Sequence, residues 1–220
     1  MIVGLLHRLR THLYPAPSGV IDRRATAAQS HHGARVRSRG WAKVTGITLH
    51  QTACVLGERP QRWDSVGAHI GITRRGQVIW LHGFDRIVAH GNGFNAQTVG
   101  IEIDGLYAGV EGNPRTVWDD PSTPAREQGM VLTPEAAEAT RQAIRWIIDD
   151  VEGRGGDVRA LVAHRQSSGA RRNDPGSAIW QAVALPMMRE LGLSDGGPGF
   201  AIGDGRPVPV EWDPSRDERY

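Results

Sequence analysis

The sequence contains one cysteine, Cys54, and one lysine, Lys43, in 220 residues. A single cysteine excludes an intrachain disulfide and a zinc cluster of several thiolates, so a bound metal would need histidine and carboxylate ligands. We interpret Cys54 itself as a small buried hydrophobic residue. Because almost all positive charge belongs to arginine, any role that lysine usually has must be filled by arginine in this chain.

Long hydrophobic runs are also missing. The N-terminus "MIVGLLHRLR" has only five apolar residues before His7, which is too short for a secretory signal and far too short to cross a bilayer. We therefore expect a soluble protein without a membrane span, synthesised in the cytoplasm without a Sec signal. A length of 220 residues with 39% hydrophobic content suits one domain with extensions.

Negative charge is scarce in residues 1–40, which contain seven arginines and one acidic residue, Asp22. A basic arm of this kind fits contact with nucleic acid, anionic lipid or an acidic cell-wall polymer, and it also fits a solvated, partly disordered extension. Arginines without interleaved aromatic residues are a weak nucleic-acid signal. We favour a solvated extension over 1–40 and expect no nucleic-acid partner.

The apolar pattern predicts several strands. "AKVTGITLHQT" predicts a strand that ends at His50, and "AHIGITRRGQVIWLH" predicts a hairpin with strands over 68–73 and 77–82. "TVGIEIDG" alternates between a β-branched face and a face that carries Glu102. Residues 105–132 are rich in Gly, Pro and Asp and are long for a connection, so we expect a functional or disordered insertion there.

Two helices and one more strand complete the pattern. Thr133 followed by proline starts a helix predicted over 134–152, "DVRALVAH" predicts a strand that ends at His164, and "GSAIWQAVALPMMREL" predicts a second helix that Pro186 kinks. This order predicts an α/β fold with a mixed central β-sheet flanked by helices. We assign the domain to 41–192 and expect the Gly/Pro-rich tail, 193–220, to wrap the surface or stay mobile.

Polar side chains stand where two predicted strands end. A sheet edge can gather His50 and His164, and Asp174 follows at the end of the polar loop "HRQSSGARRNDPG". Neutral imidazoles and a carboxylate suit zinc, and a catalytic zinc site keeps its fourth position for water. The spacing alone also fits histidines that only make structural hydrogen bonds.

Four motifs occur in order between Val44 and Leu191: "LHQTA", "VGAHIGITRRGQV", "AHGNGFNAQTVGIEIDG" and "HRQSSGARRNDPG". Together they resemble the zinc-dependent N-acetylmuramoyl-L-alanine amidases of the type 2 amidase family, which includes peptidoglycan recognition proteins and phage lysozymes with amidase activity. The resemblance implies that His50, His164 and Asp174 bind Zn²⁺. It also implies that Glu102 activates the attacking water.

The resemblance extends to further residues. Arg172 stands two residues before the aspartate, where the family usually has lysine, and by this likeness it would share the charge of the oxyanion. His69, His90 and Asn95 match polar positions beside the family's substrate groove. Each of these three is either a substrate-binding residue or a partner in a structural hydrogen bond.

Three classes of function follow from these observations. The first is an amidase that cuts between the lactyl group of N-acetylmuramic acid and L-alanine in peptidoglycan, the second is a module that binds peptidoglycan without cutting it, and the third is a nucleic-acid binder. The complete ligand set and Glu102 favour the amidase. A nucleic-acid binder, the third class, would leave the four ordered motifs without explanation.

The biological setting has three alternatives: a cytoplasmic wall-recycling enzyme, a phage endolysin released through a holin, and an effector injected into rival cells. The extensions and the 105–132 insertion favour a lysin or an effector over a minimal recycling enzyme. Such a protein would act on the cell wall or in the periplasm after non-Sec release. We expect a monomer that recognises peptidoglycan or muropeptides, with an immunity or export partner if it is an effector.

Overall fold

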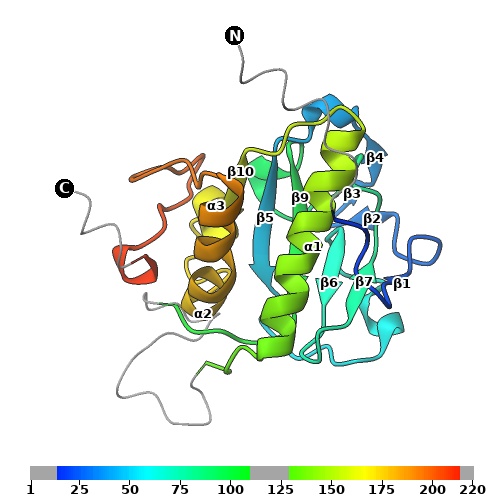
Figure 1. Cartoon of the computed structure of the whole chain (residues 1–220), viewed down its shortest axis with the longest axis horizontal. Coiled ribbons are helices and arrows are strands. Elements are labelled where there is room, and N and C mark those ends of the chain that lie inside the picture. Colours follow the sequence, from blue (N-terminus) through cyan, green and yellow to red (C-terminus); the bar gives the residue numbers. More distant parts are fainter. Residues whose placement is uncertain (1–13, 110–128, 214–220) are drawn as a thin grey trace.

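The computed structural model describes residues 14–109 and 129–213 (Figure 1). Its main sheet has six strands in the order β1–β7–β6–β9–β5–β10. Four of them run parallel to one another: β6 (Ile70–Ile72), β9 (Thr98–Ile103), β5 (Gly46–Gln51) and β10 (Ala160–Ala163). β7 (Val78–Trp80) is antiparallel to β6, and β1 (Ile21–Asp22) pairs parallel to β7. The predicted mixed sheet and its hairpin are confirmed.

Two small sheets and several short helices surround the main sheet. β2 (Ser30–His31) pairs with β3 (Ala34–Arg35), and β4 (Arg37–Ser38) pairs with β8 (Arg86–Ile87), both antiparallel. The 3-10 helices are Trp41–Lys43, Pro60–Trp63, Asn92–Phe94, His164–Ser167 and Val210–Trp212.

The predicted first helix is α1 (Pro134–Gly153), which lies across one face of the sheet (Figure 1). Thr133 caps its N-terminus, because its side chain accepts a hydrogen bond from the Ala136 N–H at 3.2 Å. The helix contacts β6, β7 and β9. No helix among residues 14–109 and 129–213 is long and apolar enough to cross a membrane.

The second predicted helix is divided into α2 (Ser177–Ile179), a π-helical turn (Trp180–Ala184) and α3 (Leu185–Leu191). Pro186 lies in the first turn of α3 and has no N–H to donate to the Ala182 carbonyl. Arg141 of α1 donates to that carbonyl at 2.7 Å instead. The irregularity that the sequence predicted at Pro186 is therefore a π-helical turn.

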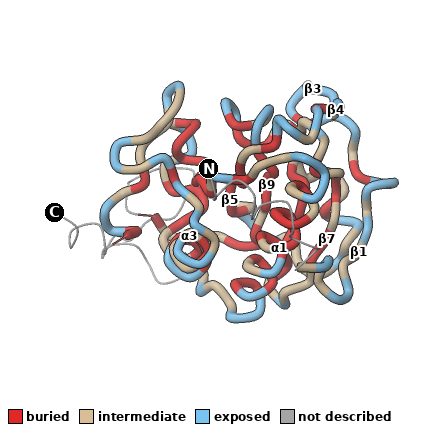
Figure 2. The backbone as a smooth tube through the Cα atoms, turned by 45° about the horizontal axis from the view of Figure 1, so that its top comes forward, coloured by how far each residue is buried: buried red, intermediate tan, exposed pale blue. Residues whose placement is uncertain are grey.

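Alternation along the strands separates the core from the predicted site. Ile47, Leu49 and Ile101 are fully buried in the same cluster as the apolar side chains of α1, so this face of the sheet packs on the helix. The intervening residues, among them His50 and Glu102, point to the opposite face. Figure 2 shows buried residues gathered along the central strands, with exposed residues on the outer loops.

The N-terminal segment differs from the expected solvated extension over residues 21–39. β1 extends the main sheet, and the Arg39 side chain is only 4% exposed. Its guanidinium donates to the carbonyls of Phe84 at 2.8 Å, Asn95 at 3.2 Å and Thr98 at 2.8 Å. Burial lowers the Arg39 pKa to about 10, which leaves it charged at neutral pH. Residues 1–13 lie outside the described residues.

The C-terminal segment, residues 194–213, packs on the domain. Ser194 forms a bridge with Ala160 of β10, and Trp212 is fully buried in the main core. In the predicted insertion, 105–132, Tyr107 is buried and residues 110–128 lie outside the described residues. Residues 214–220 also lie outside the described residues. The domain limits 41–192 stay a prediction, but packed structure continues on both sides of them.

We predict that Arg39→Ala lowers the free energy of unfolding by roughly 2 to 4 kcal/mol, because it removes the guanidinium that donates to the Phe84, Asn95 and Thr98 carbonyls. Chemical denaturation followed by circular dichroism measures this change. Arg37→Ala is the matched control, since Arg37 is exposed and should change stability by less than about 0.5 kcal/mol. Equal small effects of both substitutions would show that the Arg39 contacts add nothing to stability.

Candidate metal centre

Strand register brings the predicted residues together at one edge of the sheet. His50 of β5 is paired with Glu102 of β9, and Leu49 is paired with Ala163, the last residue of β10. His164 therefore follows β10 directly beside His50. Because parallel strands present their carboxyl ends at the same edge, three neighbouring strands place these side chains in one cluster.

The three predicted ligands form a buried triangle. His50 Nδ1 lies 2.9 Å from His164 Nδ1, which lies 2.9 Å from Asp174 Oδ2, and the distance from His50 Nδ1 to Asp174 Oδ2 is 3.9 Å. Ligand atoms on a tetrahedral zinc ion with bonds of about 2.0–2.1 Å lie about 3.3 Å apart. Within residues 14–109 and 129–213 this is the one group of three or more His, Cys, Asp or Glu residues with metal-like spacing.

A hydrogen-bond relay fixes the tautomer of His50. His90 Nε2 lies 3.2 Å from the Thr98 carbonyl, which can only accept, so His90 carries its proton on Nε2. His90 Nδ1 is then an acceptor for His50 Nε2 at 3.0 Å. His50 in turn leaves the lone pair of Nδ1 pointing into the triangle, as a metal ligand requires. Gly100 makes room for this relay, because a Cβ there would lie 2.7 Å from the His90 ring.

Asp174 is held from the neighbouring strand. The Gln51 N–H donates to Asp174 Oδ1 at 3.0 Å, while Oδ2 faces His164. The Gln51 side chain donates to the carbonyls of Asn173 at 2.7 Å and Tyr107 at 3.0 Å. Gln51 was not identified as a site residue from the sequence. Its position directly after the candidate ligand His50, at the end of a strand, could have indicated it.

Burial and neighbouring groups shift the pKa values of His50 and Asp174. Burial lowers the pKa of His50 to about 4, and electrostatic interactions with His164 and Arg171 act in the same direction. Burial opposes ionisation of Asp174, but electrostatic attraction to His164 and the hydrogen bond with His164 keep its pKa low. A neutral imidazole and an ionised carboxylate are the forms that bind metal.

Glu102 lies beside the triangle with one oxygen enclosed. Its Oε2 is buried without a hydrogen-bond partner, as is His164 Nε2. Burial and the negative charge of Asp174 raise the pKa of Glu102 well above its usual value, and Arg171 opposes this rise. Unsatisfied buried polar atoms beside a ligand triangle fit a site built to hold a cation and a polar ligand.

The other predicted polar residues make structural hydrogen bonds. His69 is fully buried, accepts from the Gly100 N–H at 2.9 Å and donates to the Arg86 carbonyl at 2.9 Å, so both ring nitrogens are occupied. Asn95 Oδ1 accepts from the N–H groups of His90 at 2.9 Å and Gly91 at 2.6 Å. His90 in turn contacts His50. These hydrogen bonds agree with a structural role for His69, His90 and Asn95, the alternative to substrate binding.

Arg171 and Arg172 differ in their surroundings. Arg172 Nε donates to the Gly169 carbonyl at 3.2 Å, and the charge that acts on both His50 and Glu102 belongs to Arg171. Arg171 is exposed.

The interpretation of Cys54 as buried was wrong, since its side chain is exposed.

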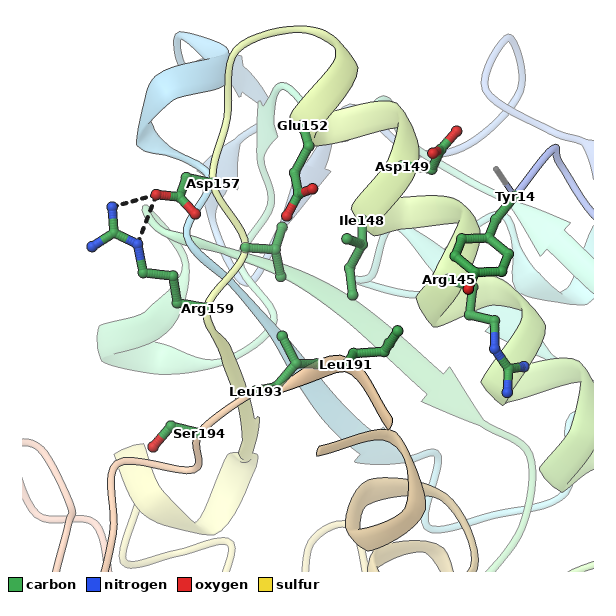
Figure 3. Close-up of a pocket in the computed structure, with 12 residues that line it drawn as sticks. Tyr14, Arg145, Ile148, Asp149, Glu152, Asp157, Arg159, Leu191, Leu193 and Ser194 are labelled. Atoms are coloured by element: carbon green, nitrogen blue, oxygen red, sulfur yellow. Dashed lines mark hydrogen bonds and ion pairs between the residues drawn. The ribbon is translucent and has the colours of Figure 1, made fainter. Parts of the chain in front are cut away.

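A pocket of about 400 Å³ lies at the other end of β10, between α1 and α3. Its lining includes the apolar side chains of Ile148, Leu191 and Leu193, and Arg159, which also lines it, pairs with Asp157 (Figure 3). None of the predicted site residues lines this pocket.

Comparison with known proteins agrees with this geometry. A family model described as N-acetylmuramoyl-L-alanine amidase matches residues 40–177. The comparison with curated sequences gave no match.

Several solved structures are similar. One is an endolysin N-acetylmuramoyl-L-alanine amidase, LysCS from Clostridium intestinale URNW, which is 14% identical to this chain with a TM-score of 0.51. The similarity covers 80% of this chain and 97% of that chain. Drosophila PGRP-LB is 14% identical with a TM-score of 0.54, over 81% and 98%. Peptidoglycan recognition protein-LE, solved with tracheal cytotoxin, a monomeric diaminopimelic acid-type peptidoglycan, is 15% identical with a TM-score of 0.53, over 81% and 98%. At these identities the similarity shows a shared fold.

The family match covers more than half of the chain and includes the strands that carry His50 and Glu102, the strand that ends at His164, and the loop that carries Asp174. The resemblance found in the sequence motifs is confirmed. The protein belongs to the N-acetylmuramoyl-L-alanine amidase family.

Proposed function

We propose that this protein binds one zinc ion through His50, His164 and Asp174 and hydrolyses the amide bond between the lactyl group of N-acetylmuramic acid and L-alanine in peptidoglycan. The observation that carries the proposal is the buried triangle of ligand atoms with Glu102 in register beside His50. Family membership supports the reaction class. Two relatives of the same fold, an endolysin amidase and a recognition protein solved with a peptidoglycan fragment, support the substrate class.

Amide hydrolysis needs a nucleophile near neutral pH and a group that accepts charge from the carbonyl oxygen. A zinc ion held by His50, His164 and Asp174 would supply both, because zinc polarises carbonyls and lowers the pKa of bound water to about 7. Glu102 takes a proton from the attacking water and returns it to the departing alanine nitrogen. Its raised pKa suits this task, since the carboxyl must hold the proton between the two transfers.

Arg171 is our candidate for stabilising negative charge that develops on the carbonyl oxygen. Its charge already reaches His50 and Glu102, and its exposed position leaves the guanidinium accessible to substrate. Arginine remains protonated at working pH, so it acts as a fixed charge and hydrogen-bond donor. This assignment replaces Arg172, whose Nε is used by the Gly169 carbonyl.

A binding module that recognises peptidoglycan without cutting it is the second candidate, because recognition proteins share the fold. The complete ligand triangle and the enclosed Glu102 favour catalysis over recognition alone.

We further propose that the protein is a lysin or an injected effector and that it acts on the cell wall as a monomer. Mass spectrometry of digested sacculi would identify both the bond that is cut and the stem peptide that is accepted.

We predict that the purified protein contains about one zinc ion per chain and that His164→Ala loses it. His90→Phe should keep the ion but weaken its binding by about 10- to 100-fold, because the His50 tautomer is no longer fixed. Metal analysis and competition with a chromophoric chelator measure both effects. His32→Asn, at an exposed histidine, is the control. Zinc content in His164→Ala equal to that of the wild type would remove His164 from the site.

Glu102→Gln should reduce turnover by about two to four orders of magnitude while zinc content stays the same, since the amide cannot accept a proton. Release of stem peptides from purified sacculi measures turnover. Cleavage near the wild-type rate in this variant would contradict the role of Glu102 as a base. Zinc binding without any cleavage by the wild type would favour the recognition module.

Arg171→Ala should lower turnover by about 10²- to 10³-fold, the usual effect of losing one donor to the oxyanion. Arg172→Ala should leave turnover close to wild type, because Arg172 Nε donates to the Gly169 carbonyl of its own loop. The two variants are measured side by side on the same sacculi. A large effect in Arg172→Ala alone would return the assignment to the position that the family motif suggests.

A further inference from the structure

Arg165 follows the ligand His164 directly, and only 2% of it is exposed. Its guanidinium connects two segments of the chain. Nε donates to the Pro207 carbonyl at 2.8 Å, and Nη1 donates to the Arg172 carbonyl. Arg172 stands two residues before Asp174, so one buried side chain joins the C-terminal segment to the loop that carries the third ligand.

The C-terminal segment, residues 194–213, contacts this ligand loop, residues 164–174, at further points. The Arg206 N–H donates to the Arg165 carbonyl at 2.8 Å, and the Ile202 N–H donates to the Gln166 carbonyl at 2.8 Å. The Gln166 side chain donates to the Asp195 carbonyl at 2.8 Å. The Arg165 guanidinium also lies 5.2 Å from the ring centre of the fully buried Trp212. The segment is therefore anchored in the core and follows the ligand loop closely.

The backbone of Arg165 also contacts the third ligand. Its N–H donates to the Asp174 carbonyl at 3.0 Å, so the same residue holds the loop through its side chain and its main chain. The family match ends at residue 177, and the C-terminal segment lies beyond it. The contact between segment and loop therefore involves residues outside the family match.

We propose that Arg165 is a positioning residue through which the C-terminal segment fixes Asp174 relative to His50 and His164 and so sets the affinity of the centre for its metal ion. The proposal rests on the proposed zinc site. A buried guanidinium cannot move without leaving carbonyl acceptors unpaired, so the loop is held in one place. Contacts that orient ligands in this way change metal affinity by about 10- to 100-fold.

The first test compares Arg165→Met, Arg165→Lys and the control Arg159→Met. Arg159 is exposed and pairs with Asp157, two residues before it. Zinc affinity is measured by competition with a chromophoric chelator, and ligand geometry by the visible absorption of the cobalt(II)-substituted full-length protein. Arg165→Met should weaken zinc binding by about 10- to 100-fold and change the cobalt spectrum. Arg165→Lys should recover part of the affinity, and Arg159→Met should match the wild type.

The second test disturbs the same contact from the C-terminal segment and applies even if Arg165→Met does not fold. A Cβ on Gly205 would lie 2.2 Å from the Gln166 carbonyl oxygen, so Gly205→Ala must push the segment away from the ligand loop. Gly203→Asn is the matched control, because no atom lies within 4 Å of a Cβ there and asparagine tolerates its positive φ of 59°. Gly205→Ala should weaken zinc binding and alter the cobalt spectrum, and Gly203→Asn should not.

The outcomes separate the two proposals. A wild-type protein that binds neither zinc nor cobalt would overturn the proposed function and this inference together. A wild type that binds zinc, with unchanged affinity and cobalt spectra in Arg165→Met and Gly205→Ala, would overturn this inference alone. Loss of thermal stability without a change in either metal measurement would assign Arg165 a structural role only, and it would also overturn the proposal.

Discussion

The parallel pairing of β9, β5 and β10 is the constraint on which the rest of the candidate centre depends. Its register places His50 opposite Glu102 and brings His164 beside His50. Because side chains alternate along a strand, a shift of one residue would turn His50 and Glu102 toward α1 and expose the isoleucines. The apolar packing under α1 therefore fixes the geometry of the polar cluster on the opposite face.

Removal from water determines the chemistry of this cluster. Burial keeps His50 neutral and raises the pKa of Glu102, while the contact with His164 keeps Asp174 ionised. The two carboxyl groups disfavour each other's charge, and a divalent cation beside them would offset that repulsion. Arg171 supplies part of this compensation from the protein itself.

Two buried arginines connect the flanking segments to the centre in the same way. Arg39 and His90 both donate to the Thr98 carbonyl, so the N-terminal segment lies close to the relay that fixes the His50 tautomer. Arg165 joins the C-terminal segment to the ligand loop through backbone carbonyls. A planar guanidinium with five donors can bind several carbonyls at once, which a lysine cannot do in the same geometry. In a chain with one lysine, arginine thus has structural roles beyond its charge.

The sequence by itself determined the mixed sheet, the long helix and the positions of His50, Glu102, His164 and Asp174, because strand alternation and the order of motifs are local properties of the chain. Only the tertiary structure showed how the surroundings of Arg171 and Arg172 differ, since Arg172 Nε donates to the Gly169 carbonyl while the charge of Arg171 acts on His50. It also decided that His69, His90 and Asn95 make structural hydrogen bonds, and that residues 21–39 and 194–213 pack on the domain. These outcomes depend on backbone carbonyls and N–H groups from distant segments, and no spacing in the sequence records where those groups will lie.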